Sequence, residues 1–226
     1  MNRPAQRSFA LAVLMMITMT PFCSWSTSLA DPHRFATVPA LVVGFMGGKE
    51  TGGVHYIAIQ LDRDPERRGP TVLFNEISVG GGSVVGKDWK EGVRIAVAAA
   101  AEAIGEDQRN WTVTIKNRSY GSLTDGASAS SAVAVGIMAA WRGDTIRSDV
   151  ALTGVITADG RIRKVGGLRG KLEGAAHAKI HTLLVPMGEA RTPEWDLYEL
   201  GRQYNVTVIE VSSLPEAYEL MTSHQP

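Results

Sequence analysis

The order of the apolar segments limits what this chain can fold into. Short runs rich in β-branched residues dominate the first half, at residues 38–45, 54–61, 71–79 and 111–116, and one Ala-rich stretch at residues 90–104 interrupts them. The second half alternates between apolar runs of strand length and longer segments with helical spacing. Strand runs followed by a mixed half predict the α+β class, in a single domain.

The same patterns predict individual elements. The runs at residues 38–45 and 54–61 flank the segment GGKETGG, which predicts a hairpin with a flexible turn. The Ala-rich stretch predicts a helix that ends at Gly105. Asp159-Gly160 predicts a second hairpin. The remaining expected elements are strands at residues 150–157, 181–185 and 206–211, and helices at about residues 128–141, 168–178, 194–204 and 214–221.

The first thirty residues differ from the rest of the chain. Two arginines precede an apolar run at residues 9–22, and a polar stretch with small residues follows as far as Ala30. This order predicts a signal peptide over residues 1–30 that is cleaved before Asp31. Because a membrane-spanning helix needs about 20 apolar residues, we expect a secreted or periplasmic protein with no stable membrane span after cleavage. An uncleaved membrane anchor is the alternative.

After that cleavage a short tail, residues 31–37, would precede one domain over residues 38–222. Cys23 is the only cysteine, so the processed chain can form neither a disulfide nor a thiol nucleophile. The formal net charge is zero and the basic residues are scattered, which argues against a nucleic-acid partner. No HExxH motif or cysteine cluster is present, so we expect no metal and no other cofactor.

The segment TDGASAS, residues 124–130, joins a turn to the start of an expected helix. Ser128 would lie in the first turn, where free backbone N–H groups could stabilise an oxyanion. Taken alone, the segment is equally compatible with Ser128 as a helix N-cap. Asp125 could form the turn with Gly126 or could shape an active-site loop.

A second segment, GGLRGK at residues 166–171, opens the next expected helix. DGASAS, then VALTGVIT, then DGRIRKVGGLRGKLEGAAHAKIHTLLVP resembles the proteolytic domain of Lon proteases, in which D-G-P-S-A-G or E-G-D-S-A-S precedes V-A-x-T-G and G-G-x-x-x-K. The resemblance is strongest over residues 125–186. Because the preceding strands and helix follow the same order, it extends over nearly all of residues 38–221.

The resemblance implies that Ser128 is a nucleophile and Lys171 its general base, with Thr153 bonded to the lysine amine and Asp125 and Gly126 in support. A lysine with an ordinary pKa of about 10.4 must lose roughly three pKa units to accept a proton near neutral pH. Desolvation and a position early in a helix both act in that direction. A solvated lysine on a helix is the alternative reading.

Three residues depart from the family pattern. Ala127 replaces a proline or aspartate, Thr124 a lysine that is common in the bacterial form, and Val155 a frequent glutamate. No ATPase module accompanies the motifs. GGSVVGK at residues 81–87 matches a phosphate-binding loop, but Asp88 stands where Ser or Thr would hold magnesium. We therefore expect a serine endopeptidase that cleaves peptides or unfolded proteins without ATP. The resemblance also suggests assembly into a homo-oligomeric ring.

Other functions compete with this one. A Ser-His-Asp triad lacks its usual G-x-S-x-G setting, and the five histidines suit surface or capping positions. A galactokinase-type small-molecule kinase resembles the Lon domain in fold, and residues 126–132 faintly match its Gly-Ser-Ser-Ala loop. A non-catalytic binding module on the same fold is the third possibility.

Overall fold

The computed structural model describes residues 34–46, 48–78, 85–119 and 125–223, all within one compact unit, Asp31–Pro226. The predicted signal peptide and its cleavage site, Cys23, Thr124 and most of the segment GGSVVGK lie outside the described residues. None of the helices in the described ranges is long and apolar enough to cross a membrane.

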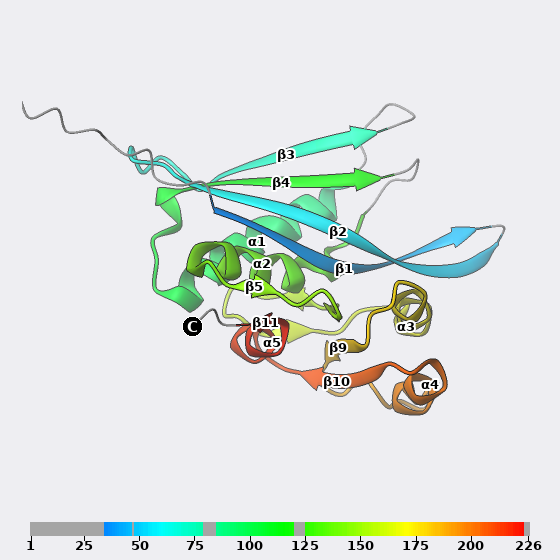
Figure 1. Cartoon of the computed structure of the whole chain (residues 1–226). Coiled ribbons are helices and arrows are strands. Elements are labelled where there is room, and N and C mark those ends of the chain that lie inside the picture. The colour runs from blue at the N-terminus through cyan, green and yellow to red at the C-terminus, as the bar shows by residue number, and fades with distance from the viewer. Residues whose placement is uncertain (1–33, 47, 79–84, 120–124, 224–226) are drawn as a thin grey trace, which may run out of the picture. The chain divides into compact units, whose positions relative to one another are not determined.

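Five α-helices and two short 3₁₀ turns accompany the strands of the described chain (Figure 1). In chain order the elements are β1 (Arg34–Met46), β2 (Lys49–Arg63), β3 (Thr71–Ser78), α1 (Lys87–Ile104), η1 (Gln108–Asn110), β4 (Trp111–Ser119), η2 (Ala127–Ala129), α2 (Ser130–Arg142), β5 (Thr145–Ile146), β6 (Val150–Leu152), β7 (Val155–Ile156), β8 (Ile162–Arg163), α3 (Leu168–His177), β9 (Thr182–Pro186), α4 (Leu197–Tyr204), β10 (Thr207–Val211), α5 (Leu214–Met221) and β11 (Thr222–Ser223).

The main sheet has seven strands in the order β10-β9-β6-β1-β2-β4-β3. Strands β10, β9, β6 and β1 run parallel, β2 is antiparallel to both β1 and β4, and β3 is parallel to β4. Strands β5 and β11 form a second sheet, and β7 and β8 form a third. A mixed sheet with packed helices in a single domain confirms the predicted α+β class.

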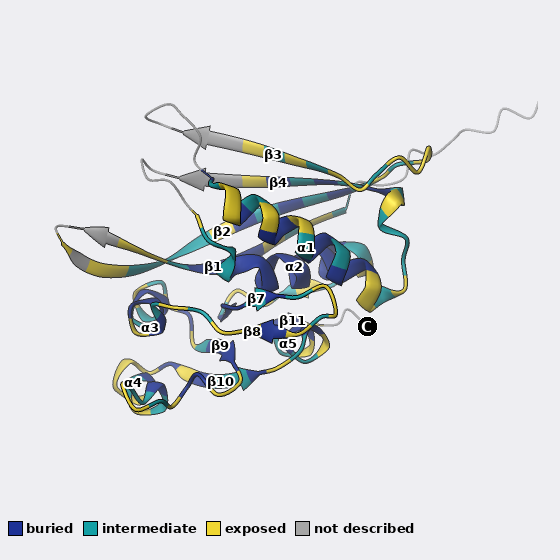
Figure 2. Cartoon of the chain, turned by 180° about the vertical axis from the view of Figure 1, so that it is seen from behind, coloured by how far each residue is buried: buried dark blue, intermediate teal, exposed yellow. Residues whose placement is uncertain are grey.

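The helices cover both faces of the sheet. The side chains of β9, which point alternately to the two faces, pack against both groups of helices. Leu184 packs into the core that contains the buried faces of α1, α2 and α5, whereas Leu183 and Val185 pack into a second core with α3 and α4. Neighbouring residues of a strand point to opposite faces, so β9 serves both cores. Helix α2 is buried along most of its length (Figure 2), which suits its run of small and β-branched side chains.

The predicted hairpin is present, but its turn is shorter than expected. Strand β2 begins at Lys49, so Gly52 and Gly53 lie within a strand and not in a flexible connection. The physical reason is the close approach of α3, because a Cβ on Gly52 would overlap the carbonyl oxygen of Gly170. Gly52 therefore allows the backbones of β2 and α3 to touch.

The predicted strand at residues 150–157 also differs from the structure, because it is divided into two. Strand β6 pairs with β9 and β1 in the main sheet, while β7 leaves that sheet to pair with β8. Thr153 and Gly154 form the break between them. Helix α4 begins at Leu197, later than predicted, because the side chain of Asp196 caps it by accepting from the N–H of Glu199 at 3.0 Å.

Candidate active site

Ser128 lies in the 3₁₀ turn η2, directly before α2, and its side chain is half-buried. The preceding Gly126 has φ 92° and ψ 142°, a backbone conformation that favours glycine. Asp125 Oδ1 accepts hydrogen bonds from the N–H of Gly126 at 2.8 Å and from the N–H of Trp89 at 3.1 Å. These bonds lower the pKa of the Asp125 carboxyl. Asp125 therefore forms the turn and also ties it to the N-terminus of α1.

Lys171 is the fourth residue of α3, and only 2% of it is exposed. Its Nζ lies 3.1 Å from Ser128 Oγ and 3.1 Å from Thr153 Oγ1. Burial lowers the pKa of the Lys171 amine from 10.5 to about 8, against the opposing charge of Glu50. The structure thus brings together Ser128, Lys171 and Thr153, three of the five residues singled out in the sequence.

Thr153 orients this contact. It is fully buried, and its hydroxyl donates to the carbonyl oxygen of Ser128 at 3.2 Å. Since that proton is used, the oxygen of Thr153 accepts from the Lys171 amine. A neutral amine has a single lone pair, and donation to Thr153 leaves that lone pair available for the hydroxyl proton of Ser128.

Further hydrogen bonds, which the sequence did not indicate, bind the nucleophile turn to the connection between β6 and β7. The N–H of Gly154 donates to the carbonyl of Ser128 at 2.7 Å, and the hydroxyl of Ser131 donates to the carbonyl of Gly154 at 2.9 Å. The N–H of Ile156 donates to Ser130 Oγ at 3.0 Å. Ser130 and Ser131 are completely buried. Three serines within four residues at a helix start were the available signal, because a buried hydroxyl requires a partner.

The position of α3 depends on glycines in both partners. Gly170 and Gly174 lie one turn apart on the face of α3 that meets β2, and a Cβ on Gly174 would overlap the backbone of Gly52 and Gly53. A Cβ on Gly170 would lie 2.7 Å from Glu50 Oε1. The close contact between β2 and α3 therefore fixes the helix that carries Lys171, and it also places the Glu50 carboxylate nearby.

The rival site chemistries find less support in the described residues. His177 and His181 are exposed, and neither hydrogen-bonds to Ser128. His55 is half-buried, and burial lowers the pKa of its imidazole. Within the described ranges no three His, Cys, Asp or Glu side chains are grouped to hold a metal ion.

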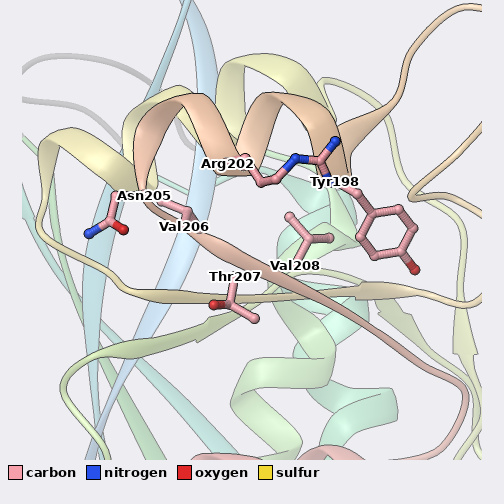
Figure 3. A pocket seen from close by; sticks show the side chains of 7 residues that line it. Tyr198, Arg202, Asn205, Val206, Thr207 and Val208 are labelled. Atoms are coloured by element: carbon pink, nitrogen blue, oxygen red, sulfur yellow. The ribbon is translucent and has the colours of Figure 1, made fainter.

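A shallow pocket of about 350 Å³ lies between α4 and β10, as Figure 3 shows. Tyr198 and Arg202 project from α4 on one side, and Val206, Thr207 and Val208 lie on the other. It contains none of the residues that meet at Lys171, so the candidate active site lies elsewhere.

Comparison with known proteins identifies the family of this chain. Residues 84–219 match the family model of the Lon protease (S16) C-terminal proteolytic domain. Lon protease 1 of Herpetosiphon aurantiacus is 33% identical over 195 residues, which are 81% of this chain and 23% of that protein. The archaeal Lon protease of Methanothermobacter thermautotrophicus is 30% identical over 181 residues, 76% of this chain and 27% of its own length.

The Lon protease of Escherichia coli K12 is 30% identical over 108 residues, 44% of this chain and 14% of that protein. The matched region thus spans no more than 27% of these three relatives. The family model nevertheless covers more than half of the present chain. The chain therefore belongs to the family of the Lon protease (S16) C-terminal proteolytic domain.

Proposed function

We propose that the chain is a serine endopeptidase that hydrolyses peptide bonds in peptides or unfolded proteins with a Ser128–Lys171 dyad. One observation carries the proposal: a buried lysine amine whose pKa falls to about 8 lies 3.1 Å from the Ser128 hydroxyl. At pH 7 such an amine is neutral in roughly a tenth of the molecules, which is about 300 times the fraction for an unperturbed lysine. A general base needs this neutral fraction.

In the first step the Ser128 hydroxyl gives its proton to Lys171 Nζ while Oγ attacks the substrate carbonyl carbon. Negative charge then develops on the carbonyl oxygen. The first residues of a helical turn have no acceptor for their N–H groups inside the turn, and here these are the N–H groups of Ala127 and Ser128. We assign them to stabilise the oxyanion.

In the second step the Lys171 ammonium returns its proton to the leaving amine, and an acyl-enzyme on Ser128 remains. Water then attacks the acyl carbon and gives a proton to Lys171 Nζ. The lysine passes this proton to Ser128 Oγ as the ester bond breaks. Thr153 holds the amine in place by accepting one of its hydrogens at 3.1 Å. The transfers between Ser128 Oγ and Lys171 Nζ therefore take place between groups that the fold holds 3.1 Å apart.

We also propose that this cleavage needs no ATP. The dyad consumes no nucleotide. The N-terminus of α1, where a phosphate-binding loop would bind its anion, already has the Asp125 carboxylate bonded to the Trp89 N–H. Asp88 in the first turn of α1 is a second carboxylate at this position, and the two together would repel phosphates.

Export and ring assembly complete the proposal. The signal-like segment supports action in the periplasm or outside the cell, and mass spectrometry of the mature N-terminus tests cleavage before Asp31. Assembly into a ring is suggested by the family, and analytical ultracentrifugation of the purified protein tests it.

The central experiment is labelling with a fluorophosphonate probe that reacts with activated serines. The wild type should label and Ser128→Ala should not, and casein should be cleaved equally with and without ATP and magnesium. A wild type that neither labels nor cleaves would favour the non-catalytic binding module. Cleavage that depends on ATP would refute the proposed independence from nucleotide and would leave the proposed dyad unaffected.

A further inference from the structure

A second hollow lies at the carboxyl ends of β9 and β10, the edge of the sheet where β6 leads into Thr153. Its volume is about 510 Å³, and its lining residues are Arg161, Ile162, Arg163, Lys164, Met187 and Ser212. Met187 directly follows β9 and Ser212 directly follows β10. Ligand sites in open α/β sheets gather at this edge. We call this hollow the basic pocket.

The basic pocket is close to the nucleophile along the backbone. Gly154, whose N–H donates to the carbonyl of Ser128 at 2.7 Å, is followed by Val155, which pairs directly with Arg163 across the β7–β8 hairpin. Successive Cα atoms are about 3.8 Å apart and paired Cα atoms about 5 Å apart. The Cα of Arg163 therefore lies within roughly 12 Å of the Ser128 backbone, a span of two to four residues of extended peptide.

The pairing of the β7–β8 hairpin shows which of its side chains share a face. A Cβ on Gly154 would overlap the side chain of Ile162, so Gly154 faces the interior. Ile156 pairs with Ile162 and both are buried, so Val155, which precedes Ile156 in β7, faces the opposite side. Arg163 pairs with Val155 and shares its side of the hairpin. The segment from β8 to α3 is largely exposed (Figure 2).

The charges of the pocket are unevenly neutralised. Arg161 pairs with Asp159 at 2.7 Å, and Lys164 pairs with Glu189 at 3.2 Å. Arg163 is exposed and forms no ion pair within the described parts of the chain. The residue opposite it, Val155, offers no carboxylate. One guanidinium therefore remains available beside the cleavage site.

Met187 gives the pocket an apolar wall next to that charge, because 53% of this methionine is exposed. A glutamate or aspartate side chain has the matching chemistry. Its carboxylate can accept two parallel hydrogen bonds from a guanidinium, and its methylene groups can contact the methionine.

We propose that the basic pocket is a substrate subsite that binds an acidic side chain through Arg163, two to four residues from the scissile bond. The proposal rests on the peptidase function proposed above and narrows its substrates to acidic peptides. Arg163 acts on binding and plays no part in proton transfer.

Matched fluorogenic peptides test the subsite. Each peptide carries one Glu or one Gln, placed in turn at each of four positions on either side of the cleaved bond. The wild type should prefer Glu at one position by about three- to tenfold in kcat/KM, the range for a partly exposed charged hydrogen bond. Arg163→Gln should remove the preference, and added salt should weaken it.

Two further variants sharpen the comparison. Arg94→Gln changes an equally charged, exposed arginine of α1 and should leave the preference intact. Val155→Glu places a carboxylate opposite Arg163 and should remove the preference as Arg163→Gln does. Equal cleavage of Glu and Gln peptides by the wild type, or a preference that survives Arg163→Gln, would overturn the subsite while the peptidase function stands.

A wild type that cleaves no peptide would overturn the proposed function instead, and the subsite would then be decided by binding. Fluorescence anisotropy of labelled Glu and Gln peptides with Ser128→Ala protein supplies that measurement. Tighter binding of the Glu peptide that is lost in Ser128→Ala/Arg163→Gln supports the subsite, and equal binding of both peptides rejects it.

Discussion

Replacing Lys171 with methionine should stabilise the folded protein while abolishing its activity. Methionine has nearly the same length as lysine and no charge to desolvate. The folded protein lowers the pKa of the amine from 10.5 to about 8. This difference means that folding disfavours the protonated lysine by about 3 kcal/mol, since each pKa unit corresponds to about 1.4 kcal/mol.

The effect has a defined pH window. Below pH 8 the lysine is charged in both the folded and the unfolded chain, so the full penalty is present. As pH rises from 8 to 10.5, the folded protein loses its proton first, and the stability of the wild type increases. The advantage of Lys171→Met should therefore be about 3 kcal/mol at pH 7 and under about 1 kcal/mol at pH 10.5.

The hydrogen bonds that disappear with the amine should change this figure little. Thr153 keeps its bond to the carbonyl of Ser128 at 3.2 Å, and the half-buried hydroxyl of Ser128 can bind water. No buried donor loses its acceptor, so the usual penalty for an unsatisfied group does not arise.

Urea unfolding, followed by the fluorescence of the buried Trp89 and Trp111, measures the difference at both pH values. Lys87→Met is the matched control, because that lysine is exposed and its replacement should show no such pH dependence. A Lys171→Met protein that is no more stable than the wild type at pH 7 would refute the argument. An advantage that stays constant to pH 10.5 would refute it equally.

Three other predictions follow from the same contacts. Lys171→Arg should abolish peptide hydrolysis as thoroughly as Ser128→Ala, because a guanidinium keeps its proton at any working pH; near-normal activity of the folded variant would exclude the dyad. Activity should rise with pH through about 8. Glu50→Gln should move that rise to lower pH by about a few tenths of a unit, because an exposed carboxylate acts weakly through solvent. A move to higher pH would contradict the charge effect assigned to Glu50. Gly52→Ala should lower the free energy of unfolding by more than about 2 kcal/mol, because the new methyl group would overlap α3. Gly44 faces open space, so Gly44→Ala should change the free energy of unfolding by less than about 0.5 kcal/mol. Chemical denaturation compares the two variants.

Most elements of the fold could be predicted from the sequence, because local signals mark them. The Ala-rich helix ends at Gly105 in the left-handed conformation with φ 72°, as its sequence indicates. The hairpin at Gly160 likewise follows its turn signal. Local patterns could not predict the role of Gly52, since glycine serves both flexible turns and close backbone contacts. Only the position of α3 decides between the two.

The candidate site could likewise be predicted only in part. The resemblance to the Lon family singled out Ser128, Lys171 and Thr153, and the structure places their polar atoms within hydrogen-bonding distance. The buried serines that follow the nucleophile were not predicted, because their partners come from a distant strand. Their hydrogen bonds depend on the break between β6 and β7, which lies within the segment VALTGVIT that the sequence analysis predicts as one strand.

The departures from the family pattern can now be placed relative to the dyad. Ala127 meets α1, where a Cβ on Gly92 would lie 2.9 Å from the Cβ of Ala127, so the two small residues let the turn approach that helix. Val155 lies on the β7–β8 hairpin opposite Arg163. Neither residue takes part in the contacts that hold Lys171 Nζ. Changes at these two positions should therefore alter the shape and charge of the substrate site. The pKa of the base is set by the burial of Lys171 against the charge of Glu50, and Thr153 holds the amine in position.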